Sequence, residues 1–239
     1  RAEIEAARAR GDFDDPDGDH DFKFDFDFDR EVDKEIIEKL KAKGISIDKM
    51  IRIRDGRDDD ALTPGGKLMR AASKCNDTEV RRLIVEDKAN VNTRVDGDGT
   101  PLIVASRKGC IDTVRTLLNA GADANLASSG DGNPLIQAAA RGHDGVAKLL
   151  LERGANVNGY VEGDETPLIN AAERGELAIA ELLVDSGAKV NLAYIVEVRG
   201  AGAKKELRSP LNMAERHGKD AVAAYLRSKG ATLSPKAAN

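Results

Sequence analysis

A short pattern of apolar and polar positions returns along the chain every 33 residues. Residues 97–110 read "GDGTPLIVASRKGC", residues 130–143 read "GDGNPLIQAAARGH", and residues 163–176 read "GDETPLINAAERGE". The apolar run after each Pro has the length of a short helix. The stretch that follows, such as "IDTVRTLLNA", places Val114, Leu117 and Leu118 on one helical face. The pattern therefore predicts two short helices in each unit.

Polar residues and glycines at fixed positions of the unit predict where each helix begins and ends. A capping side chain stands before a Pro that suits the first helical turn, as in Thr100-Pro101, Asn133-Pro134, Thr166-Pro167 and Ser209-Pro210. One glycine column permits the turn between the helices, and a second supplies a left-handed cap after the second helix. These columns are Gly109, Gly142, Gly175 and Gly218, then Gly121, Gly154, Gly187 and Gly230. Asn92, Asn125, Asn158 and Asn191 recur at the same interval.

Five units are expected, and together they form an array over residues 61–233 with a tail at 234–239. The units are expected at 65–97, 98–130, 131–163, 164–206 and 207–233. The first is degenerate, because residues 65–92 lack Thr-Pro and both glycines, and we interpret it as a capping repeat. The fourth carries an insertion in which Tyr194 and Val196 alternate with Ile195, a pattern that predicts a β-hairpin.

The repeated phrases "TPLIVAS", "NPLIQAA", "TPLINAA" and "SPLNMAE" resemble the ankyrin repeat, whose pattern includes T-P-L-H-x-A at a period of 33. This resemblance implies a mainly α solenoid of helix-turn-helix units with hairpin-like connecting loops. It also implies a module that binds a protein partner with its loop tips and the groove of its first helices. The usual His is replaced by Ile103, Ile136, Ile169 and Asn212, which favours more apolar packing there.

The distribution of charge along the chain limits which classes of partner are expected. The chain has a net charge of −5, but residues 1–60 hold 13 basic and 20 acidic side chains, and the remainder holds 24 and 22. The array is nearly neutral, so no nucleic-acid partner is expected. No apolar run reaches the roughly 18 residues of a membrane span. We therefore expect that this chain does not insert into a membrane. We also expect a monomer, which is either cytoplasmic or the soluble tail of a membrane protein.

The sequence holds no recognisable catalytic set. Three scattered His, no phosphate-binding glycine loop and no Cys/His cluster favour a non-catalytic protein without a metal or cofactor. Cys75 and Cys110 make no disulfide framework, and the pattern favours free thiols.

Three groups of residues are candidates for partner binding. The loop tips supply an acidic and polar group: Asp96, Asp98, Ser129, Asp131, Glu162, Asp164 and Glu165. The ends of the first helices supply Lys74, Arg107, Lys108, Arg141, Glu173 and Arg174, and His217 ends the same column. The inserted hairpin supplies Tyr194 and Val196. Each group has a plain structural alternative: turn formation at the tips, the helix dipole at the basic column, and a tolerated surface loop.

Two segments precede the array. Residues 1–30 form an acidic Phe/Asp-rich linker, expected to be disordered or an edge strand, because nine of residues 12–29 are Asp. Asp15, Asp17 and Asp19 have part of the EF-hand spacing, but Gly18 and His20 break the motif, so we expect no calcium site. Residues 31–60 predict a short helical pair, with Ile36, Ile37 and Leu40 on one face.

A second resemblance covers residues 31–233. The phrase "LKAKGISIDKMIRIRDG" and the repeated "GDGTPLI" phrases are similar to the C-terminal tails of antirepressor-type (BlaR-like) bacterial membrane metallopeptidases that carry ankyrin repeats. It implies, as the alternative function, a soluble regulatory or sensor tail. The zinc-binding H-E-x-x-H motif does not occur in this sequence, so any catalysis would lie outside this chain.

Overall fold

The computed structural model describes residues 63–95, 99–198 and 204–233. The expectations for the acidic linker, the helical pair before residue 61 and the tail therefore lie outside the described residues. The described part holds ten helices and two strands: α5 Pro64–Ser73, α6 Asp77–Val85, α7 Pro101–Lys108, α8 Ile111–Asn119, α9 Pro134–Ala140, α10 Asp144–Glu152, α11 Pro167–Arg174, α12 Leu177–Asp185, β1 Tyr194–Val198, β2 Lys204–Arg208, α13 Pro210–Arg216 and α14 Asp220–Ser228. The fold is mainly α, as predicted.

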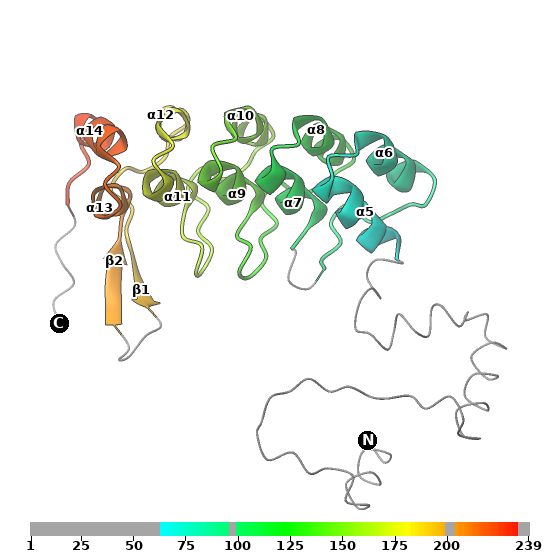
Figure 1. Ribbon diagram of the computed structural model, residues 1–239, viewed down its shortest axis with the longest axis horizontal. Helices are drawn as coiled ribbons and strands as arrows, with labels where there is room; N and C mark the ends of the chain where they lie inside the picture. Colours follow the sequence, from blue (N-terminus) through cyan, green and yellow to red (C-terminus); the bar gives the residue numbers. More distant parts are fainter. Residues whose placement is uncertain (1–62, 96–98, 199–203, 234–239) are drawn as a thin grey trace, which may run out of the picture. The chain divides into compact units, whose positions relative to one another are not determined.

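The helices form two parallel layers (Figure 1). The first helices of the units, α5, α7, α9, α11 and α13, stack on one another as the inner layer, and the second helices, α6, α8, α10, α12 and α14, stack as the outer layer. Leu, Ile, Val and Ala side chains between the layers make one hydrophobic core that runs from Leu68 to Ala231. This continuous core confirms the predicted repeat solenoid.

The predicted caps begin the inner helices. In each inner helix the capping oxygen accepts a hydrogen bond from the backbone N–H three residues later, for example from Ile103 to Thr100 Oγ1 at 3.2 Å. The other capping residues are Thr63, Asn133, Thr166 and Ser209. Ile103, Ile136 and Ile169, which replace the usual His, are fully buried. The predicted apolar packing at these positions is confirmed.

The first unit differs from its prediction. Thr63 caps α5 and Pro64 begins it, so this unit does have a Thr-Pro start, placed earlier than the expected boundary at residue 65. The two left-handed positions that glycine fills in the later units are also kept. Cys75 and Lys88 occupy them with φ angles of 54° and 52°. An L-residue in this conformation costs about 1–2 kcal/mol relative to glycine, so the first unit keeps the repeat geometry at an energetic cost.

The expectation of free thiols is wrong. Cys75 and Cys110 form a disulfide, with their Cα atoms 5.2 Å apart. They are separated by 35 residues, but each lies in the turn between the two helices of its unit. Stacking places these turns side by side, so the contact follows from the tertiary arrangement and not from a local motif.

The asparagine column joins neighbouring units. Asn125 Nδ2 donates to the Gly154 carbonyl at 3.0 Å, and its Oδ1 accepts from the Asn156 backbone N–H at 2.7 Å. Asn92, Asn158 and Asn191 make the same pair of bonds to the unit that follows each of them. Each asparagine therefore satisfies one carbonyl and one N–H after the next outer helix, where the helix itself leaves carbonyls unpaired.

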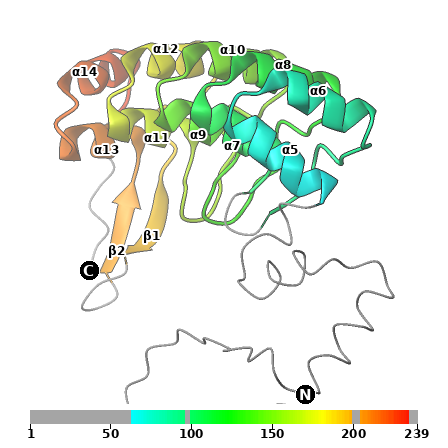
Figure 2. The ribbon, with the colours of Figure 1, turned by 45° about the vertical axis from the view of Figure 1, so that its right-hand side comes forward.

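The loops between units project from the inner layer on the side away from the outer helices (Figure 2). Three of them close with a single antiparallel bridge, as between Ser128 and Gly132. The insertion in the fourth unit forms the predicted hairpin, in which β1 pairs with β2 and Tyr194 lies opposite Arg208. The hairpin extends beyond the other loops in Figure 1.

Candidate protein-interaction surface

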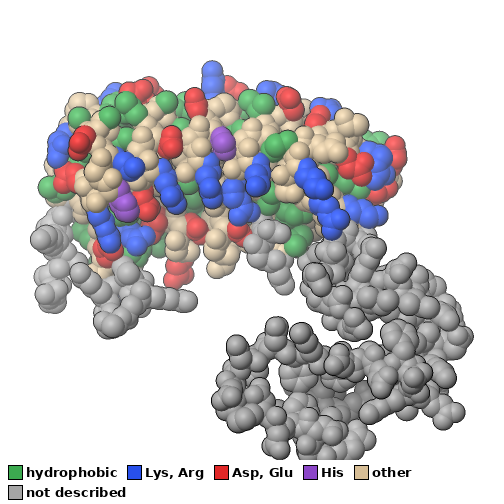
Figure 3. Space-filling view, in the orientation of Figure 1, with side chains coloured by type: hydrophobic (Ala, Val, Ile, Leu, Met, Phe, Trp, Pro, Cys, Tyr) green, Lys and Arg blue, Asp and Glu red, His purple; other side chains and the backbone are tan. Residues whose placement is uncertain are grey.

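Four basic residues occupy one position in four successive units. Lys108 and Arg174 are the last residues of α7 and α11, and Lys74 and Arg141 follow directly after α5 and α9. All four side chains are exposed. We call these four residues the cationic row. Lys and Arg side chains gather in a band along the inner-helix layer in Figure 3.

No carboxylate in the described part of the chain neutralises the cationic row. Within the described ranges, none of its four members forms an ion pair with a carboxylate. His217, the fifth member of the predicted column, differs, because its Nε2 lies 3.7 Å from Oε1 of Glu173. Glu173 itself is half-buried. Glu173, the acidic candidate among the ends of the first helices, therefore faces His217 of the next unit.

The turns beside the row are closely packed. His143 lies over Gly109, and its Nε2 is 3.2 Å from the Arg107 carbonyl oxygen. Glu176 and Lys219 lie over Gly142 and Gly175 in the same way. A side chain of the next unit therefore packs over each of these turns, next to the exposed cations of the row.

Two candidate tip residues are buried instead of exposed. Asp131 is 7% exposed, and its Oδ1 lies 3.2 Å from Nη1 of Arg107 in the preceding unit. Glu165 is 3% exposed, and its Oε1 lies 2.7 Å from Nη1 of Arg208 on β2. Asp131 thus ties its loop to helix α7 and Glu165 ties its loop to the inserted hairpin, so the structure presents neither acid at an exposed tip. Arg107 is itself half-buried in this contact.

The other tip candidates fall into three groups. Ser129 and Glu162 are exposed. Asp164 is half-buried; its burial and the charge of Asp131 raise its pKa, against a hydrogen bond from the Gly132 backbone. Asp96 and Asp98 lie outside the described residues. The exposed tip is therefore smaller than the sequence indicated.

Burial also affects Glu165. Desolvation raises its pKa above the ordinary value of 4.5, although the charge of Arg208 and its hydrogen bond act in the opposite direction. The loss of water around the carboxylate, together with the charges of Glu173 and Asp164, outweighs the pairing with Arg208. Glu165 also has a φ of 55°, at the position that Gly99 and Gly132 occupy in the preceding loops.

The inserted hairpin packs against the preceding loop. The rings of Tyr160 and Tyr194 stack with their centroids 4.0 Å apart. Val196 is half-buried, and Arg216 forms an ion pair with Glu206 of β2. On the opposite face Ile195 is 61% exposed. The two candidates in the hairpin thus lie on its packed face, and the exposed apolar residue beside them was not among the candidates.

Other kinds of site find no support in the described part of the chain. No three His, Cys, Asp or Glu side chains there lie together in a way that would hold a metal ion. None of the helices described is both long and apolar enough to cross a bilayer.

Paired short helices, stacked in two layers with projecting loops, define this chain as a repeat solenoid. A family model for three copies of the ankyrin repeat matches residues 33–128, 68–160 and 120–194. These matches cover more than half of the chain, which belongs to the ankyrin-repeat family. Such repeats are generally non-catalytic modules for protein–protein interaction. Comparison with curated proteins gives no match.

Sequence reasoning missed three features of this surface. The loop acids that pair with Arg107 and Arg208 look like ordinary exposed turn residues in the sequence. The asparagine column was visible as a period, but its bonds to the next unit were not. The burial of Asp131 and Glu165 was missed as well, because they stand three and two residues before a helix-starting Pro and share no common position that would signal it.

Proposed function

We propose that this chain is a non-catalytic interaction module that binds a protein partner through its inner-helix face and exposed loop tips. The observation that carries the proposal is the cationic row, a set of exposed charged side chains held at equivalent positions by one continuous core. The continuous core holds residues that are distant in sequence side by side, and together they form a surface that a macromolecule can bind.

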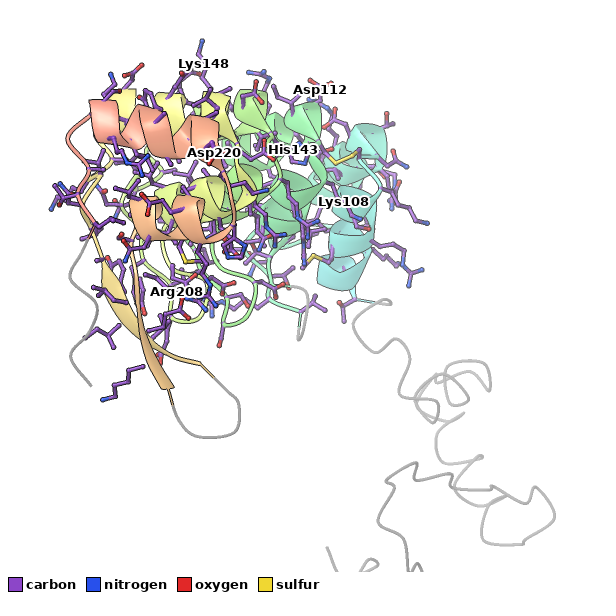
Figure 4. All side chains as sticks on the ribbon, turned by 60° about the vertical axis from the view of Figure 1, so that its left-hand side comes forward. Lys108, Asp112, His143, Lys148, Arg208 and Asp220 are labelled. Atoms are coloured by element: carbon purple, nitrogen blue, oxygen red, sulfur yellow. A yellow bond between two sulfur atoms is a disulfide. The ribbon has the colours of Figure 1, made fainter. Side chains whose placement is uncertain are left out.

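Site-specific photocrosslinking tests this proposal. A photoreactive amino acid at Arg141 or Ser129 in the full chain should capture the partner protein, and the same group at Lys148 should not. Lys148 is exposed on the outer helix α10, and Figure 4 shows it at the outer edge, apart from Lys108 at the inner layer. Capture only from Lys148 would move the binding surface to the outer helices and reject the proposal.

We also propose that the protein is a monomer and that it does not bind nucleic acid. The asparagine column and the buried ion pairs join units of one chain, so these contacts stabilise the described array without a second copy of the chain. Sedimentation equilibrium at several protein concentrations should give the mass of one chain. A mass that rises with concentration would contradict this part.

A regulatory or sensor tail of an antirepressor-type membrane metallopeptidase is the second candidate. Its support is the resemblance of residues 31–233, which includes the phrase "LKAKGISIDKMIRIRDG". The test is the complete reading frame around this chain. An upstream H-E-x-x-H motif with hydrophobic spans would support the candidate, and an open reading frame without them would remove it.

A further inference from the structure

The cationic row differs from several arginines of the array that pair with carboxylates. Arg107 and Arg208 pair with Asp131 and Glu165. Arg82, Arg216 and Arg227 also have carboxylate partners. Within the described residues, these five arginines have carboxylate partners, whereas the four members of the row have none. As far as the described residues show, the charges of the row are available to a ligand.

The helix dipole does not account for the row by itself. A cation near a helix C-terminus gains about 0.3–1 kcal/mol, and this applies equally to the outer helices. Yet α8, α10 and α12 have no basic residue in their last turn, although Arg153 follows directly after α10, where it donates to Asn119 Oδ1. The outer helices α6 and α14 do carry Arg82 and Arg227 there, but both are paired within the protein. Each of the first four inner helices thus ends at a cation without a carboxylate partner among the described residues, whereas among the outer helices only α10 does, at Arg153.

Acidic side chains stand near the row without pairing with it in the described part of the chain. Glu176 lies over Gly142 beside Arg141, and Lys219 lies over Gly175 beside Arg174. Asp112 and Asp144 stand in the first turns of α8 and α10, where the dipole favours acids. None of these carboxylates lies within ion-pair distance of the row in the part of the chain that the structure describes.

We propose that the cationic row binds an extended acidic segment of a protein partner. Packed helices lie roughly 8–10 Å apart, so the row presents a positive charge at about that interval. In an extended polyproline II conformation three residues span about 9 Å and every third side chain returns to the same face, so carboxylates at every third residue match the row. The inner helices that carry the row contain no aromatic residue for base stacking, which favours a polypeptide over single-stranded nucleic acid. This inference rests on the proposed function and specifies the chemistry of the partner.

Binding of a synthetic peptide to the full chain tests the inference. The probe is a fluorescent peptide of about 15 residues with Glu at every third position and Ser or Gly between. The first comparison is a peptide of the same composition with its Glu residues adjacent, and the second replaces Glu with Gln. Tight binding of the spaced peptide, weakened by added salt, is expected. Equal binding of the adjacent-Glu peptide, or of the Gln peptide, would overturn the inference.

Matched charge variants locate the site. The triple variant Lys108→Ala, Arg141→Ala, Arg174→Ala should weaken peptide binding about tenfold or more at low salt. Each exposed ion pair with the peptide contributes little to the binding free energy, but the loss of three pairs adds up. The control variant Arg115→Ala, Lys148→Ala, Lys189→Ala removes the same charge from exposed positions outside the row and should change affinity less than about twofold. Equal losses in both variants would show only a general charge effect and would overturn the inference. Thermal unfolding of each variant confirms that the array is intact.

Two further outcomes separate this inference from the proposed function. If the peptide fails to bind while crosslinking from Arg141 still captures a protein, the acidic-segment inference is wrong and the interaction function stands. If an oligonucleotide binds more tightly than the spaced peptide and loses affinity in the row variant, the ligand is nucleic acid and the inference is overturned.

Discussion

Cys75 and Cys110 form a disulfide between the inter-helix turns of the first two units. In the next three interfaces the equivalent positions hold Gly109 beneath His143, Gly142 beneath Glu176 and Gly175 beneath Lys219. A Cβ atom at any of these glycines would lie within 3 Å of the side chain above it. The first interface uses the same close approach for a covalent bond. The degenerate first unit is thereby tied to the regular array.

Removal of this bond should destabilise the protein. A disulfide that closes a loop of this length contributes about 2–4 kcal/mol by restricting the unfolded chain. The double variant Cys75→Ser, Cys110→Ser should lower the free energy of unfolding in urea by that amount. A reducing agent should have the same effect on the wild type and none on the double variant. Equal stability of the wild type and the double variant would show that the bond adds nothing.

The left-handed backbone at residue 75 leads to a separate prediction. Cys75→Gly and Cys75→Ala both lose the disulfide, but only glycine adopts a φ of 54° without strain. We expect the glycine variant to be more stable than the alanine variant by about 1 kcal/mol. The measurement is chemical denaturation of the two variants side by side. A more stable alanine variant would mean that this turn changes its conformation once the disulfide is absent.

The asparagine column should contribute to coupling between units. Asn158 bonds to the Gly187 carbonyl at 3.2 Å and to the Lys189 backbone N–H at 2.9 Å. Asn158→Ala removes both bonds and should cost about 1–2 kcal/mol. Asn119→Ala is the control, because Asn119 is exposed and accepts one bond from Arg153. The control should cost less than Asn158→Ala in thermal unfolding, and a reversed order would contradict the role given to the column.

Glu165 should make stability depend on pH. Because burial raises its pKa above 4.5, the folded protein holds this proton more tightly than the unfolded chain does. The linked stability is fully present below pH 4.5 and is lost as the pH rises through the raised pKa. The free energy of unfolding of the wild type, minus that of Glu165→Gln, should therefore fall with increasing pH. A difference that grows with pH would show that the attraction of Arg208 outweighs desolvation.

Local chemistry made most helices predictable. Thr100 caps α7 through a residue only three positions away, and Gly109 and Gly121 take their positive φ values within one turn of a helix end. The alternation of Tyr194, Ile195 and Val196 was enough to predict β1. The first unit was harder, because Cys75 and Lys88 stand where glycine signals the turns. Its helix start at Pro64 was missed because the spacing to the next unit is not 33 residues.

The sequence by itself determined the helix pairs, their capping and their repetition, because these depend on residues within a few positions of one another. Only the tertiary structure decided which charged residues are buried and which are exposed. Asp131 meets Arg107 across 24 residues, Cys75 meets Cys110 across 35, and Glu165 meets Arg208 across 43. Such contacts exist only after the units stack, and stacking also leaves the cationic row on the surface, without carboxylate partners among the residues that the structure describes.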